Sequence, residues 1–444
     1  MACEPKSATR RPRREEARGS PWDTRTRRGT NAALDRIVPR IRVAAADSGY
    51  ASEIAGSSNP RHGDTLRCSF DRAETFAIGV EEELLLVDRS HSLSPVAAQL
   101  LAFLGDDDRF HPELSPSQIE IVSGTHPDAA GAVADLVRGR RRVIDALNGE
   151  ARLVGLAAHP ICDLLPAVSP GSRYAAIEQR YRWAAHRAGL AAGVHVHLGV
   201  PGADRLLAIY NALRGLMPQI AALAAAAPFF AGRDTGLASV RPKLSDALPR
   251  QGVGPAFATW DDVADLLAWG ARSGAFLDHT ELWWECRLHP GFGTIEVRVP
   301  DAQSSAGEVE ALATVVHCTV RWLAARHDAG QRLPAHGSLA ISENRWRATT
   351  DGVEGELIDL DRMRLVRARD LLERLLDQIS EYARSATEAR ALERARRRLD
   401  WPHPRQQRAT VMRGGLEALI AESADLTENV EHAPSPQGVG GRYE

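Results

Sequence analysis

Apolar and polar residues alternate along several short segments of this chain, a pattern that predicts β-strands with one apolar and one polar face. In GVEEELLLVD three glutamates interrupt an apolar run, and we interpret residues 75–87 as one strand. Because side chains alternate across a strand, Glu81 and Glu83 share one face while Glu82 lies on the other. Two carboxylates on one face favour a metal ion or an arginine opposite them, although a solvated edge strand would show the same pattern.

The same alternation recurs in three further segments. SQIEIVSG places Glu120 on a polar face, AAGVHVHLGVP aligns His195 with His197, and GTIEVRVPD sets Glu296 beside Arg298. Each segment alone has an ordinary explanation. Histidine pairs also occur in cores and at surfaces, and a glutamate beside an arginine forms common ion pairs between strands.

Four such strands together predict a metal-binding face. Its negative charge is too high for a stable core, and divalent cations would resolve that conflict. The oxygen-rich set suits Mg²⁺ or Mn²⁺ better than zinc, and several metal ions bridging phosphate oxygens are what phosphoryl transfer requires. The residues of this face are Glu81, Glu83, Glu120, His195 and Glu296.

Helical periodicity appears in longer segments between these strands. It predicts helices at residues 128–147, 204–226, 261–272, 308–327 and 369–399, with Pro218 breaking the second of them. Strands and helices do not alternate regularly. This mixture predicts an α+β fold, in which helices pack against a mainly antiparallel sheet.

The two ends of the chain differ from the middle. Residues 1–72 carry more basic than acidic residues and little apolar periodicity, so we interpret them as a disordered basic leader. Residues 73–426 are predicted to form one large domain, and residues 427–444 a polar, flexible tail.

Composition narrows the function classes. The 444 residues carry a formal net charge of −3, which predicts small-molecule substrates and no nucleic-acid partner. The five cysteines form no CxxC pair, which favours a reducing cytoplasm over a disulfide framework. The longest apolar stretch, residues 220–231, is too short to span a membrane. The oligomeric state stays open, a homodimer included.

Lysine occurs only at Lys6 and Lys243, so the chain has no GxxxxGK[ST] phosphate loop. Nucleotide phosphates would have to be bound by metal ions and arginines. Candidates are Arg241 in PFFAGRDTGLASVRPK and Arg345 in ISENRWRATTDG, since guanidinium groups grip phosphates and carboxylates in bidentate fashion. An arginine-rich composition would also scatter arginines without function.

Six segments, in order between residues 75 and 376, resemble the glutamate–cysteine ligase type 2 family of carboxylate–amine ligases: GVEEELLLVD, SQIEIVSG, GVHVHLGVP, PFFAGRDTGLASVR, GTIEVRVPD and ENRWRATTDG. The resemblance implies a glutamine-synthetase-like fold, with metal and ATP on the inner face of a curved antiparallel sheet. It also implies ATP-dependent ligation. The γ-carboxylate of glutamate, or of a related acid, takes the γ-phosphoryl group of ATP, and an amine, nominally cysteine, displaces phosphate from the acyl phosphate.

Carried over residue by residue, the resemblance assigns Arg298 to phosphate, Arg241 to phosphate or the acyl phosphate, and Arg345 to a further nucleotide contact, with His197 behind the metal ligands. The implied ligands of Mg²⁺, or of Mn²⁺, are Glu81, Glu83, Glu120, His195 and Glu296.

Two segments depart from the family pattern. RLHP, residues 287–290, replaces an expected Arg-Pro-Ser stretch, and PKLSDALPRQGVG after Arg241 lacks expected aromatic residues. Both are expected to border the substrate pockets, so a ligase of the same fold for another acid and amine stays open. A metal-dependent hydrolase using His195 and His197 is a further alternative, but it does not explain the additional glutamate-bearing strands.

Overall fold

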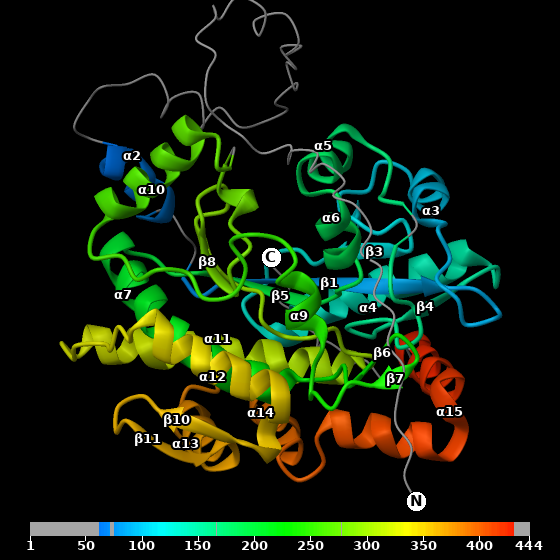
Figure 1. Ribbon diagram of the computed structural model, residues 1–444. Coiled ribbons are helices and arrows are strands. Elements are labelled where there is room, and N and C mark those ends of the chain that lie inside the picture. The colour runs from blue at the N-terminus through cyan, green and yellow to red at the C-terminus, as the bar shows by residue number, and fades with distance from the viewer. Residues whose placement is uncertain (1–61, 72–74, 166, 277, 430–444) are drawn as a thin grey trace, which may run out of the picture. The chain divides into compact units, whose positions relative to one another are not determined.

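The computed structural model describes residues 62–71, 75–165, 167–276 and 278–429, arranged as in Figure 1. The strands in these ranges are β1 (Ile78–Val87), β2 (Phe110–Pro112), β3 (Gln118–Val122), β4 (Arg152–Val154), β5 (Val194–Gly199), β6 (Phe229–Phe230), β7 (Arg233–Asp234), β8 (Cys286–His289), β9 (Thr294–Val297), β10 (Glu356–Asp359) and β11 (Arg364–Arg367). The helices are α2 (His62–Asp71), α3 (Ala97–Leu104), α4 (Ala129–Leu147), α5 (Ser172–Tyr181), α6 (Trp183–Ala188), α7 (Ala203–Leu213), η1 (Arg214–Leu216), α8 (Met217–Ala224), α9 (Arg241–Ser245), α10 (Trp260–Ser273), η2 (His279–Glu281), α11 (Ala306–Asp328), α12 (Ser338–Asp351), η3 (Gly352–Glu354), α13 (Ala368–Ser380), α14 (Ala386–Arg397) and α15 (His403–Glu428).

The main sheet has the strand order β2-β3-β1-β5-β9-β8, and β4 also pairs with β1. Every strand pairing in it is antiparallel, as the sequence predicts. Its register aligns the polar positions of four strands. Glu83 lies opposite Glu120, Glu81 opposite His195, and His197 opposite Glu296. The four polar faces thus form one continuous row.

The other face of the sheet is apolar and packs against α4, α7 and α11. Val80, Leu84, Val196 and Val297 are fully buried there in one hydrophobic core. Each such side chain contributes about 1.5–3 kcal/mol when it leaves water. The alternation seen in the sequence therefore separates the two faces, because one faces the core and the other stays free for polar groups.

One charged residue of β1 points into this core. Glu82 is buried against Arg140 of α4, whose guanidinium donates to both of its carboxylate oxygens at 2.8 and 2.5 Å. The same guanidinium donates to the carbonyl oxygens of Ser304 and Thr427. Arg140 therefore ties β1 to the start of α11 and to the end of α15.

Most predicted helices form close to the predicted bounds. The carboxylate of Asp128 caps α4 by accepting from the amide of Gly131 at 2.9 Å. The helix predicted at residues 204–226 is broken as expected: α7 ends at Leu213, a 3₁₀ turn follows, and α8 begins with Pro218 in its first turn. Pro218 is accommodated there because the first turn of a helix needs no amide donor at that position.

The single helix predicted at residues 369–399 is wrong. Two helices, α13 and α14, occupy this range, and the side chain of Ser385 caps the second by accepting from the amide of Glu388. Both helices have strongly amphipathic sequences, so their apolar periodicity hides the break. Serine in this position favours a helix start over a helix interior.

The ends of the domain extend beyond the predicted bounds. Residues 62–71, interpreted from sequence as leader, form α2, and its Leu66 and Phe70 are fully buried in the main core. At the other end α15 continues to Glu428, and Thr427 is fully buried. The remaining leader residues 1–61 and 72, and tail residues 430–444, lie outside the described residues.

One helical stretch in the described part of the chain, Ala203–Ala224, has the length and apolar composition of a membrane span. However, 72% of its most apolar window is buried inside the protein. Its buried hydrophobic residues up to Ile220 belong to the hydrophobic core that α7 shares with the sheet, and Ala222, Leu223 and Ala224 belong to a second core cluster.

Candidate functional site

A cleft of about 690 Å³ lies over the polar face of the sheet, with α5, α6 and α9 contributing to its walls. Figure 1 shows α5 and α6 on the side of β1 opposite to α11. Of the residues predicted from sequence to form the site, all except His197 and Glu296 line this cleft: Glu81, Glu83, Glu120, His195, Arg241, Arg298 and Arg345. The predicted residues are therefore brought together, although they come from segments far apart in the sequence.

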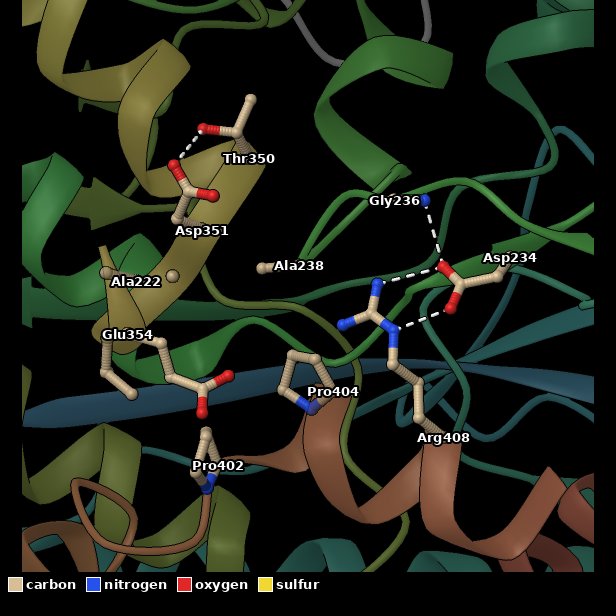
Figure 2. A pocket seen from close by; sticks show the side chains of 12 residues that line it. Ala222, Asp234, Gly236, Ala238, Thr350, Asp351, Glu354, Pro402, Pro404 and Arg408 are labelled. Atoms are coloured by element: carbon tan, nitrogen blue, oxygen red, sulfur yellow. Dashed lines mark hydrogen bonds and ion pairs between the residues drawn. The ribbon is translucent and has the colours of Figure 1, made fainter. Parts of the chain in front are cut away.

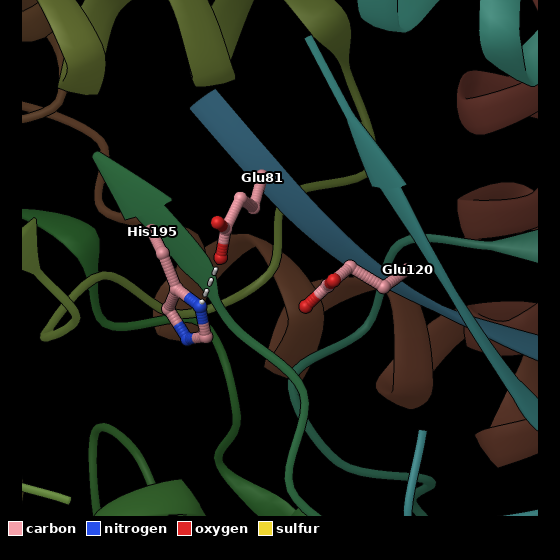
Figure 3. Close-up of side chains that lie close together, drawn as sticks. All are labelled: Glu81, Glu120 and His195. Carbon is pink, nitrogen blue, oxygen red and sulfur yellow. Dashed lines mark hydrogen bonds and ion pairs between the residues drawn. The ribbon is translucent and has the colours of Figure 1, made fainter. Parts of the chain in front are cut away.

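Glu81 is the centre of the row. Its Oε2 lies 3.1 Å from Nδ1 of His195, and its Oε1 lies 3.0 Å from Nε2 of His197. Figure 3 shows the contact between Glu81 and His195, with Glu120 approaching from β3 on the other side of Glu81. Nε2 of His195 has no hydrogen-bond partner among the described residues and lies 3.6 Å from Oε1 of Glu83.

The possible ligand atoms form three groups, each within 4.8 Å: Glu81, Glu120 and His195; Glu81, His197 and Glu296; Glu83, Glu113 and Glu120. Glu113 lies directly after β2 and was missed by the sequence analysis. His197 was expected to support the metal ligands without binding the metal itself. Its ring nitrogen nevertheless belongs to one of the three groups of possible ligand atoms.

Burial and mutual repulsion shift the pKa values of the carboxylates in this row. Burial, with the nearby charge of Glu113, raises the pKa of Glu83 to about 8. Burial and repulsion from Glu81, Glu113 and Glu83 raise the pKa of Glu120 well above its ordinary value. Burial would also raise the pKa of Glu81, but hydrogen bonds with His195 and His197 outweigh it, so that pKa is lowered.

These observations fit a divalent cation. Burial and crowding raise the pKa values of Glu83 and Glu120, which favours their protonated forms, and a cation that replaces those protons removes the repulsion. Burial, together with the charge of Arg298, lowers the pKa of His195 to about 4, so its imidazole is neutral and its unpartnered Nε2 suits a metal ligand. The oxygen-rich donors match Mg²⁺, and the imidazoles also suit Mn²⁺.

Glu296 lies beneath the cleft and is fully buried. Arg287 and Arg298 both donate to its carboxylate, and burial, which would raise its pKa, is outweighed by their positive charges, so the pKa falls well below its usual range. Glu296 therefore anchors two guanidinium groups as well as facing His197, whose Nε2 is 3.9 Å from its Oε1.

Arg241, at the start of α9, lies close against the backbone of β5 and the segment after β9. Its guanidinium donates to the carbonyl oxygens of Arg298 and Val299 at 3.1 and 3.2 Å, and its buried Nε has no partner among the described residues. A Cβ atom at Gly193 would overlap this guanidinium, so any larger residue there would require the side chain of Arg241 to move. The amide of Gly193 also donates to Glu83 Oε2 at 2.5 Å, which links Arg241 to the acidic row.

Arg345, from α12, also lines the cleft. It donates to Glu285 at 2.5 Å and to both carboxylate oxygens of Asp246 at 3.0 and 2.7 Å. Two carboxylates therefore already balance its charge, whereas the guanidinium of Arg241 lies 3.9 Å from a single carboxylate oxygen, Oδ1 of Asp301.

Known proteins resemble the part of the chain that forms this cleft. The sequence signature of glutamate–cysteine ligase family 2 (GCS2) matches residues 77–422. The chain belongs to this family. Membership in the GCS2 family makes it an enzyme of the ATP-dependent ligase class.

Two family relatives match most of the chain. A protein of Rubrobacter xylanophilus, provisionally named glutamate–cysteine ligase 2-3, is 36% identical over 327 residues, which cover 72% of this chain and 87% of that protein. A protein of Thermobifida fusca, provisionally named glutamate–cysteine ligase 2, is 33% identical over 372 residues, which cover 80% and 93%.

Solved structures share the fold. A glutamate–cysteine ligase from Francisella tularensis, crystallised in complex with AMP, matches with a TM-score of 0.60 at 14% identity, over 81% of this chain and 90% of that one. A bifunctional glutathione synthetase from Pasteurella multocida matches with a TM-score of 0.59 at 13% identity, over 83% of this chain and 54% of that one. The α+β fold predicted for this GCS2 chain is confirmed.

The segments that depart from the family pattern line the cleft, as expected. Arg287 and His289 come from the RLHP segment, and Pro242, Ser245 and Gln251 come from the segment after Arg241.

A second cavity, of about 350 Å³, lies elsewhere, between α12, η3 and the start of α15. Figure 2 shows its walls, where Arg408 and the amide of Gly236 donate to Asp234. It contains none of the predicted site residues.

Proposed function

We propose that this chain joins glutamate to cysteine, with ATP, through an acyl phosphate, to give γ-glutamylcysteine, ADP and phosphate. The observation that carries the proposal is the cleft itself. It combines carboxylate and imidazole groups that suit divalent cations with arginines suited to phosphate, in a member of a ligase family.

The metal-binding residues in this proposal are the predicted five together with Glu113 and His197. Magnesium held there would neutralise the charge that develops on the transferred phosphoryl group. These ligands are Glu81, Glu83, Glu113, Glu120, His195, His197 and Glu296.

The arginines orient the reacting groups. Arg298, held by Glu296 and 3.4 Å from Nδ1 of His195, stands beside the metal row and would bind phosphate. Arg241 would bind the phosphate or the acyl phosphate through its free Nε edge. Arg345, already paired with Glu285 and Asp246, suits a role in shaping the rim of the nucleotide site. The work of the protein is positioning and charge neutralisation, without an obligatory general base.

A second candidate is a ligase of the same fold acting on another acid or amine. The observation that favours it is the position of the two departing segments on the cleft wall, where they contact any substrate bound there. A hydrolase is disfavoured, because His195 and His197 share their surroundings with five glutamates and two arginines instead of forming an open histidine site. The proposed reaction requires ATP and reduced cysteine, which places it in the cytoplasm.

The test is product analysis. Purified protein is incubated with ATP, Mg²⁺, glutamate and cysteine, and with each component omitted in turn, and products are identified by mass spectrometry. We expect ADP and γ-glutamylcysteine only in the complete mixture. ADP formed only with another acid and amine would establish the second candidate, and ADP formed without any amine would contradict ligation.

A further inference from the structure

An exposed aromatic ring projects into the cleft from the turn between β8 and β9. The ring of Phe292 stacks on that of His289, with centroids 4.3 Å apart and planes inclined by only 10°. Both side chains line the cleft, yet Phe292 is 66% exposed whereas His289 is buried. One face of the phenyl ring is therefore covered by imidazole and most of the rest is open to the cleft.

The turn holds this ring firmly. The amide of Phe292 donates to Nδ1 and to the carbonyl oxygen of His289 at 3.2 and 3.3 Å, which fixes the imidazole against the turn. Gly293 has a φ of +66°, and a Cβ there would press on the carbonyl oxygen of Ser69 in α2. His279 packs edge-on against His289 at 4.7 Å. These contacts hold the backbone of the turn in place, and the turn lies against α2 at Gly293.

The platform formed by the stacked rings of His289 and Phe292 adjoins one metal group. The ring of His197 lies 5.5 Å from both His289 and Phe292, and His197 belongs to the group that also contains Glu81 and Glu296. Phosphates bound to a cation in that group would lie next to the platform. In a nucleoside triphosphate the ribose then carries the base away from the phosphates, toward a flat apolar surface. Glutamate and cysteine have no ring to place there.

We propose that Phe292 is a nucleotide-binding residue, whose open face stacks on the adenine of ATP. This inference rests on the proposed function, because it takes the substrate of the cleft to be ATP. Stacking on an aromatic face needs no particular base, since every base offers a π-face. The platform therefore contributes affinity for the nucleotide and little discrimination between adenine and guanine.

The test compares Phe292→Ala and Phe292→Trp with Phe103→Ala. Phe103 is a control of the same residue type, 76% exposed on α3 and outside the cleft. Binding of Mg·ATP and Mg·GTP is measured by calorimetry. We expect Phe292→Ala to weaken binding of both about 5- to 150-fold, the range of base–aromatic stacking. Phe292→Trp should retain binding, and Phe103→Ala should not change it.

Two further readouts separate stacking from a structural effect. Magnesium tripolyphosphate, which lacks a base, should bind wild type and Phe292→Ala equally. The triphosphate of 2-aminopurine riboside should lose fluorescence on binding wild type, since stacking quenches it, and should keep most of it on Phe292→Ala.

The outcomes separate a failure of the stacking proposal from a failure of the proposed ligase function. If wild type binds Mg·ATP and Phe292→Ala binds it equally well, the platform is refuted and the ligase proposal stands. If Phe292→Ala raises only the KM of the amine, the ring serves the amine and the inference is refuted. If wild type does not bind Mg·ATP, the proposed function fails and the inference fails with it.

Discussion

At the scale of single residues, the site depends on Glu81. It is the one side chain that contacts both His195 and His197, and it belongs to two of the three possible ligand groups among the described residues. Glu296 is predicted from sequence to be a metal ligand as well, but its substitution is less suitable as a test of metal binding. It is buried between two arginines, so neutralising it would leave their charges unpaired and destabilise the fold.

We predict that Glu81→Gln lowers Mg²⁺-dependent turnover of ATP by at least about 100-fold, more than the loss of a residue behind a metal ligand usually causes. Thermal unfolding should change little, because the carboxylate lies in the cleft and not in the core. The readout is initial rate against Mg²⁺ concentration. The exposed Glu150→Gln serves as control. Turnover within a few-fold of wild type would remove Glu81 from the metal site.

The sequence could reveal these residues because alternation along a strand is local. Glu81, Glu83, His195 and Glu296 each stand out within a few positions of their own strand. Glu113 could not be found this way, since β2 has three residues and shows no alternation. The contact between Arg287 and Glu296 required the register of β8 on β9, which pattern alone does not give.

At the scale of elements, the sequence predicted a helix end correctly where a proline marks it. It missed the break where no proline or glycine interrupts the apolar periodicity. Pro218 marked the break between α7 and α8, but no proline or glycine separates α13 from α14. The helix α15 was missed because Gly415, with a φ of +78°, kinks it and disrupts its pattern. The helix α2 was missed because basic residues precede it and only Leu66 and Phe70 mark its apolar side.

The contact between β1 and α4 leads to a prediction at this scale. Arg140→Met leaves Glu82 buried without its partner, so we expect the free energy of unfolding to fall by about 3–5 kcal/mol. The measurement is urea denaturation followed by circular dichroism.

The double variant Arg140→Met/Glu82→Leu tests the cause. Because it removes both charges, it should unfold less readily than Arg140→Met alone. A double variant that is as unstable as the single one would show that the carbonyl contacts of Arg140, and not its pairing with Glu82, account for the loss.

At the scale of the whole described domain, the core holds a histidine that should make the fold sensitive to acid. His317 of α11 is fully buried and hydrogen-bonds through Nε2 to the carbonyl oxygen of Phe76 at 2.8 Å. Burial, with the charge of Arg321, lowers its pKa from 6.5 to about 3. The unfolded chain therefore binds this proton more readily, so stability is retained above pH 6.5 and lost as the pH falls below it.

We predict that wild type loses about 2 kcal/mol more stability than His317→Gln between pH 7 and pH 5. Glutamine can still donate to the carbonyl of Phe76 but cannot take up a proton. The measurement is urea denaturation of both proteins across this range. Parallel loss of stability in the two proteins would mean that His317 does not titrate with unfolding.

The central claim is that the cleft activates a carboxylate by phosphorylation before an amine attacks it. The most direct test uses glutamate labelled with oxygen-18 in its γ-carboxylate, together with ATP, Mg²⁺ and cysteine, followed by mass spectrometry of the phosphate released. An acyl phosphate transfers one carboxylate oxygen to phosphate, so the account predicts one oxygen-18 atom in each phosphate formed. Unlabelled phosphate, with its new oxygen drawn from water, would show hydrolysis of ATP without carboxylate activation and would contradict the account.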